Sequence, residues 1–129
     1  MKRFLWISAL VATAAVGLVL ARRPAAAHHS STPFYDDTKR VEAVGTVSRF
    51  IFRNPHSFLF IDGVDEAGEP VEWEVEMSAA VSMRRSGWTP ETIRAGDAIK
   101  AVGQPSRAPG TYGMCCAQLT RPDGSPIRP

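Results

Sequence analysis

Two of the three histidines in this 129-residue chain are adjacent, within the stretch AAAHHSS at residues 25–31. If a signal peptidase cuts after Ala27, His28 becomes the first residue, and its amine and its own Nδ1 close a six-membered chelate on one metal ion. If the cut falls one residue earlier, His29 stands at position three, where amine, amide and imidazole nitrogens share a plane. Planar nitrogen donors favour Cu(II), which lies at the top of the divalent affinity order. The pair therefore indicates a copper site; the alternative is a solvated arm without a fixed partner.

The remaining histidine, His56, follows Asn54 and Pro55 in a stretch with strong turn signals. It is a candidate third nitrogen ligand for the metal. The alternative is a structural role, in which the imidazole caps the start of the next strand or forms a hydrogen bond across the mouth of the fold.

Cys115 and Cys116 are the only cysteines of the chain. Neighbouring side chains of a regular strand face opposite ways, and their Cα atoms lie about 3.8 Å apart, which is below the usual span of a disulfide. A bridge between them would need a strained turn. The alternatives are a buried thiol beside an exposed one, an intermolecular bridge, or soft ligands for Cu(I) together with Met114.

Other side chains suit binding better than catalysis. The acidic row Glu72, Glu74 and Glu76 is typical of the solvated face of a strand. Three aromatic residues are candidate contacts for a ligand or partner if they are exposed: Phe50, Phe52 and Trp88. We find no nucleophile elbow, no carboxylate pair with readable roles and no nucleotide-binding loop, so we predict no catalytic residues and no enzyme.

The first 27 residues are typical of a secretory signal peptide, with a basic start, an apolar run from Phe4 to Ala21 and a small-residue cleavage site. An uncleaved membrane anchor is the alternative, but it would place Arg22 and Arg23 on the outer side of the membrane. Cleavage removes four of the 15 basic residues, leaving 11 against 13 acidic ones and a net charge of −2. We therefore expect a periplasmic protein without a permanent anchor and without nucleic-acid binding, which needs a basic surface.

The elements that must position these residues are mostly strands. Strand-like runs cover residues 41–52, 57–64, 71–77, 98–104 and 114–121. Gly45 is expected to mark a bulge or bend and Gly68 the hairpin turn. The segment between Ser78 and Gly96 is expected to form two short helices, capped by Ser78 and Thr89. Three strands, a helical connection and two strands predict an all-β, five-stranded OB-like barrel, with a small β-sandwich as the alternative.

The expected organisation is a signal peptide at 1–27, a polar arm at 28–40, the barrel at 41–124 and a frayed end at 125–129. The expected core residues are Val44, Val47, Phe50, Phe58, Phe60, Trp73, Val75, Ile93, Ile99 and Val102.

Several short motifs follow one another along the chain: AHHS at the export junction, GTV, NPH, W-x-x-E and RRSGWTPETIRAGD, and finally a DG turn near the end. In this the chain resembles an uncharacterised family of exported bacterial proteins, one of the domain-of-unknown-function families. The resemblance implies a small periplasmic β-barrel of unassigned activity. The positions that match the family pattern are His28, His29, Ser30, Asn54, Pro55, His56, Trp73, Gly87, Trp88, Gly96 and Asp97. The cysteine pair lies outside this pattern, so any thiol role would belong to this protein alone.

Two functions remain from these observations. The first is a periplasmic protein that binds copper through His28, His29 and His56. The second is a non-catalytic OB-type module that binds a small ligand, a glycan or a periplasmic protein partner. A folded arm that brings the paired histidines toward His56 would favour the first.

Overall fold

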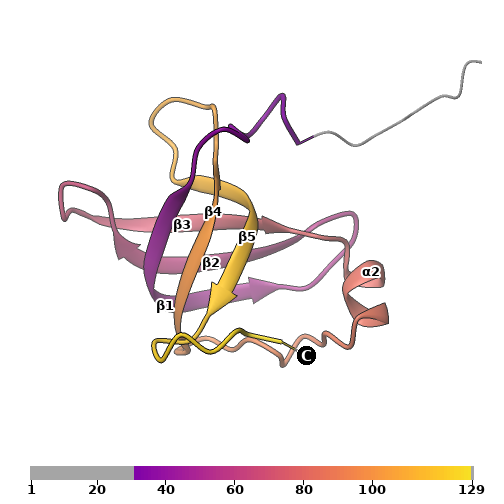
Figure 1. Ribbon diagram of the computed structural model, residues 1–129. Coiled ribbons are helices and arrows are strands. Elements are labelled where there is room, and N and C mark those ends of the chain that lie inside the picture. The colour runs from indigo at the N-terminus through magenta and orange to yellow at the C-terminus, as the bar shows by residue number, and fades with distance from the viewer. Residues whose placement is uncertain (1–30, 129) are drawn as a thin grey trace, which may run out of the picture.

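The computed structural model describes residues 31–128, in which five strands close into a barrel (Figure 1). The elements are β1 (Val41–Ile51), β2 (Ser57–Val64), β3 (Pro70–Met77), α2 (Ala80–Arg85), β4 (Ala98–Pro105) and β5 (Gly113–Thr120). Around the barrel the order is β1-β2-β3-β5-β4, and β4 pairs with β1 to close it. Among the strands that the structure describes, only β3 and β5 pair in parallel. The predicted all-β fold with a short helical connection is confirmed as a closed five-stranded barrel, and the sandwich alternative is wrong.

Strand β1 bends so that it can pair with both β2 and β4. Its irregularity lies between Val47 and Arg49, not at Gly45. Gly45 is needed for another reason, because a Cβ atom there would lie 1.9 Å from the backbone oxygen of Asp62. The expected bulge at Gly45 is therefore wrong, and the glycine instead permits the close approach of β2.

The barrel interior differs in part from the expected core. Val47, Trp73, Val75, Ile93 and Ile99 are buried as predicted. Val44 is 56% exposed, because β1 points Ala43 and Val47 into the barrel and alternate residues such as Val44 outward. Phe50, Phe58, Phe60 and Val102 are only partly buried.

Strand β2 explains two of these differences. It is apolar on both faces, so alternation alone cannot say which face points inward. Leu59 and Ile61 fill the interior, while Phe58 and Phe60 lie on the outer face. There the guanidinium groups of Arg53 and Arg49 lie 5.7 and 3.6 Å from the respective ring centroids. These cations cover the two rings and make their outward placement favourable.

The connection after β3 contains one helix, not two. Helix α2 receives its cap from Asn54, whose Oδ1 accepts the Val81 N–H at 3.1 Å, and not from Ser78. The stretch from Thr89 to Gly96 forms turns, although the Thr89 hydroxyl still accepts the Glu91 N–H at 3.2 Å.

The end of the described chain is held against the barrel. Ile127 donates its N–H to the Leu119 oxygen at 2.9 Å and packs against the core. No helix within residues 31–128 has the length and apolar character to cross a membrane. The predicted signal peptide lies outside the described residues.

Candidate functional site

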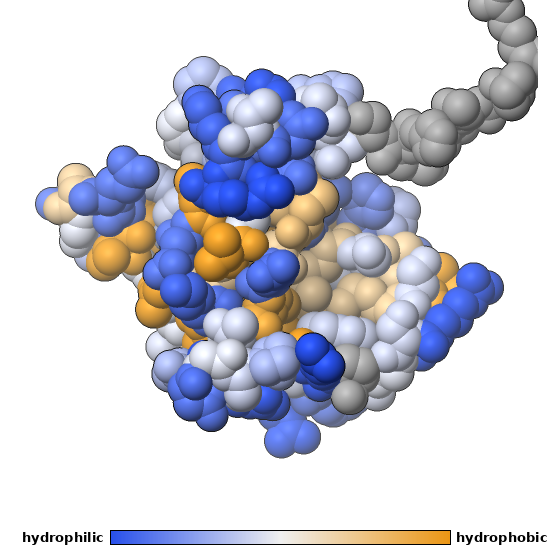
Figure 2. All heavy atoms as spheres, viewed as in Figure 1, coloured by the Kyte–Doolittle hydropathy of each residue, from blue (hydrophilic) through white to orange (hydrophobic). Residues whose placement is uncertain are grey.

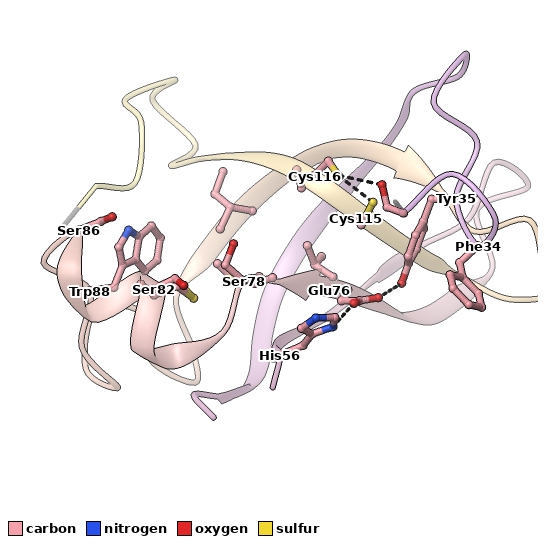
Figure 3. Close-up of a pocket in the computed structure, with 16 residues that line it drawn as sticks. Phe34, Tyr35, His56, Glu76, Ser78, Ser82, Ser86, Trp88, Cys115 and Cys116 are labelled. Carbon is pink, nitrogen blue, oxygen red and sulfur yellow. Dashed lines mark hydrogen bonds and ion pairs between the residues drawn. The ribbon is translucent and has the colours of Figure 1, made fainter. Parts of the chain in front are cut away.

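An open groove of about 750 Å³ runs along the barrel between α2 and the segment that precedes β1. Figure 2 shows moderately hydrophobic side chains in this hollow, bordered by hydrophilic ones. In Figure 3 the groove has two ends: Tyr35, Glu76, His56 and the two cysteines lie toward one, and Trp88 and Ser86 toward the other. The first end holds the ionisable side chains of the groove.

A chain of polar contacts crosses this end. The Tyr35 hydroxyl donates to Glu76 Oε2 at 2.5 Å, and His56 Nδ1 is paired with Glu76 Oε1 (Figure 3). A carboxylate can only accept, so the proton of a neutral His56 lies on Nδ1 and the Nε2 lone pair is left available. Burial, and then the hydrogen bond to Glu76, raises the pKa of the Tyr35 phenol well above its ordinary range.

The register of the β2–β3 hairpin brings His56 to Glu76. Phe58 pairs with Glu76, and His56 precedes Phe58 by two residues, so it shares that face and is a diagonal neighbour of Glu76. This contact was missed in the sequence, where Glu76 counted as one member of a solvated row. The hairpin register was the signal that could have found it.

Cys115 and Cys116 both line the groove, which contradicts their expected opposite orientations. Cys115 of β5 pairs with Gln104 of β4, and Gln118 pairs with Val102. The two pairs are three residues apart on β5 but only two apart on β4, so β5 has one extra residue there, a β-bulge. Cys116 takes the left-handed conformation, with φ of 56°. This bulge interrupts the alternation, and the two Sγ atoms lie 2.9 Å apart. Both cysteines are free thiols, Cys115 buried and Cys116 exposed.

The segment before β1 folds onto the loop between β4 and β5. Arg107 Nε donates to the backbone oxygens of Thr32 and Tyr35 at 2.9 and 3.1 Å. Tyr35 and Ser106 form an isolated antiparallel bridge. Ser31 is thereby held in the groove wall, with its Oγ 3.9 Å from Cys116 Sγ. The part of the arm that the structure describes is therefore attached to the barrel.

The predicted metal ligands fall on both sides of the described boundary. His56 lies in the groove, whereas His28 and His29 lie outside the described residues. Among residues 31–128, no three His, Cys, Asp or Glu side chains are arranged to hold a metal ion.

The candidate aromatic face is divided. Trp88 is partly buried and lines the groove, but Phe50 and Phe52 do not. These two rings contact each other at 5.6 Å between centroids, and Phe52 is covered by the guanidinium of Arg84 at 5.3 Å. The three residues thus do not form one exposed platform.

Comparison with known proteins identifies a family for this chain. No curated protein and no solved structure matches the chain. One family model does match, over residues 15–115, and that range includes the histidine pair, the NPH turn and most of the barrel. The chain therefore belongs to the family described as a family of unknown function, DUF6152.

Proposed function

We propose that this protein is exported and binds copper at the arm end of the groove, through the amine and imidazole of His28 together with His29 and His56. One observation carries the proposal: Ser31, two residues after His29, lines the same groove as His56. A polypeptide spans at most about 3.6 Å per residue, so the Cα atoms of His29 and His28 lie within about 7 and 11 Å of that of Ser31. We infer from this reach that both histidines share a metal with His56.

The surroundings of His56 fit a metal ligand. Metal-binding histidines usually donate their other ring N–H to a carboxylate or carbonyl, which fixes the tautomer and raises the basicity of the ligating nitrogen. Glu76 takes that position, and Tyr35 in turn donates to Glu76. The side chain of His56 is 47% exposed, which leaves room for an ion beside the ring.

The donor set favours copper over other divalent ions. A terminal amine and imidazole nitrogens are strong donors for Cu(II), and the two thiols of the same groove are soft donors suited to Cu(I). The role that fits is binding or transfer of copper without catalysis.

The test is a Cu(II) titration of protein purified from the periplasm, with its natural N-terminus established by intact mass and the site read by electron paramagnetic resonance. We expect one tight site with nitrogen hyperfine structure. An extra N-terminal residue should abolish the site, and His56→Gln should reduce the number of coupled nitrogens. The titration is repeated in Cys116→Ser, because an exposed thiol can reduce Cu(II) and silence the signal.

Glu76→Gln has a matched control in Glu72→Gln, a carboxylate on the same strand that pairs with Arg49 instead of a histidine. We expect weaker copper binding in the first variant and unchanged binding in the second. A spectrum that is identical in wild type and His56→Gln would remove the groove from the site. Weak, non-stoichiometric binding by wild type would overturn the copper proposal.

The size of the groove favours a second candidate, a module that binds a small ligand without catalysis. Its volume lies in the range of small-molecule sites, and Trp88 offers a flat, partly buried surface at the end away from the thiols. Nuclear magnetic resonance titration with glycan and small-molecule panels, with metal chelated, tests this. Saturable shifts confined to the groove would favour it, and their absence would exclude it for the panel used.

A further inference from the structure

The geometry of the cysteine pair also suits a reaction between the two thiols that needs no metal. The bulge in β5 turns both thiols to one side, and this conformation is supported by the opposite strand. Gly103 faces the bulge, and a Cβ atom there would lie 2.6 Å from the Cys115 backbone oxygen. The close packing of β4 on β5 thus depends on a glycine at that position.

The two thiols differ in accessibility. Cys115 is 4% exposed and donates to Gln104 Oε1 at 3.7 Å, whereas Cys116 is exposed at the groove surface. Burial, followed by the hydrogen bond with Cys116, raises the pKa of the Cys115 thiol to about 12. A reagent in the groove therefore meets the exposed Cys116 first, with the buried Cys115 behind it.

We propose that Cys115 and Cys116 are a redox site that forms a reversible vicinal disulfide by exchange with an external disulfide such as oxidised glutathione. The Cys116 thiolate attacks one sulfur of that disulfide, forms a mixed disulfide and releases one thiolate. Cys115 then loses its proton and attacks Cys116 Sγ, which forms the Cys115–Cys116 bond and releases the second thiol. Two protein thiols are oxidised and one external disulfide is reduced to two thiols.

We expect the bridge to be easily reversed. Adjacent Cα atoms lie closer together than those of ordinary disulfides, and strained bridges are the more reducible ones. Formation of the Cys115–Cys116 bond also converts the Cys116 thiol, which contacts Ser31, into a disulfide sulfur. Oxidation therefore alters the groove wall where the arm is attached.

The test treats fully reduced protein with excess oxidised glutathione in the presence of a metal chelator, then blocks remaining thiols with an alkylating agent and measures intact mass. We expect the monomer to lose the mass of two hydrogens, to take up no alkylating agent, and to recover both thiols on addition of reduced glutathione. Peptide mapping should place the bond within the single peptide that contains both cysteines.

The two single variants test the order of events. Cys115→Ser should stop at a stable glutathione adduct on Cys116. Cys116→Ser should react slowly, because the remaining thiol is buried. A glutathione adduct that persists in wild type, or conversion to a disulfide-linked dimer, would overturn the proposal. The chelator keeps this result independent of the copper proposal, since the exchange needs no metal.

Discussion

Glu76 and Glu72 are four residues apart on one strand face, but their partners give them different roles. Glu72 accepts two hydrogen bonds from Arg49, both at 2.8 Å, and both side chains are substantially exposed. Such surface pairs contribute about 0–1 kcal/mol to stability. Glu76 instead contacts Tyr35 and His56 in the groove, so its main effect is to orient an imidazole.

At this same scale, the phenol of Tyr35 predicts a loss of stability in alkali. Its pKa is raised in the folded protein above its ordinary value of 10.0, chiefly by burial and then by Glu76. Above about pH 10 the unfolded chain releases this proton while the folded chain keeps it, so the free energy of unfolding falls as pH rises. Below that pH, the full contribution of Tyr35 to the free energy of unfolding is present.

We expect Tyr35→Phe to lose less stability than wild type between neutral pH and pH values above about 10 in urea denaturation. The pKa of the other tyrosine of the chain, Tyr112, is also raised, by its hydrogen bond to Asp65. Tyr112→Phe therefore measures how much of the loss in alkali comes from that residue instead of Tyr35. If the wild-type and Tyr35→Phe curves run parallel over this range, Tyr35 ionises equally in both states and the prediction is wrong.

At the scale of the elements, the Asn-Pro-His turn connects a helix to the site. Asn54 caps α2 through its side chain, and the backbone oxygen of Arg53 accepts the Ala80 N–H at 3.0 Å. Two residues after Asn54, His56 pairs with Glu76. One turn thereby fixes both the start of α2, which lines the groove, and the candidate ligand within it.

Asn54→Ala removes that cap and should lower the free energy of unfolding by about 1 kcal/mol. Asn54→Asp keeps an acceptor for the Val81 N–H and should stay close to wild type. Urea denaturation measures both variants, and amide exchange at Val81 reports the cap directly. Equal stability of Asn54→Ala and wild type would show that water replaces the side chain at no cost.

At the scale of the whole molecule, the alternation of β1 determines which of its residues pack in the barrel core and stabilise the fold. Val47 is 2% exposed and Val44 is 56% exposed on the same strand. We expect Val47→Ala to cost about 2 kcal/mol and Val44→Ala less than about 0.5 kcal/mol in the free energy of unfolding. Similar losses for both valines in thermal or urea denaturation would contradict this assignment of inside and outside.

The sequence predicted the barrel better than the site. Alternation in β3 and the turn at Gly68 placed the strands, because both follow from local periodicity and turn chemistry. Burial in β2 was mispredicted because the strand is apolar on both faces. The contacts of Glu76 with Tyr35, and of Cys116 with Ser31, join residues far apart in the chain and depend on how the segment before β1 packs on the barrel.

The barrel is closed unevenly. β2 and β3 share eight paired positions, but β3 and β5 share only three, ending at Glu76 opposite Cys115. The groove thus begins where the shortest seam of the barrel ends. Transient opening of that seam would move His56 and Glu76 away from the cysteines while every antiparallel pairing stays intact, and it would appear as the fastest amide exchange among the strands. If the groove binds copper as proposed, the bound ion should resist opening of this seam, and amide exchange at Glu74 to Glu76 should slow when copper is added.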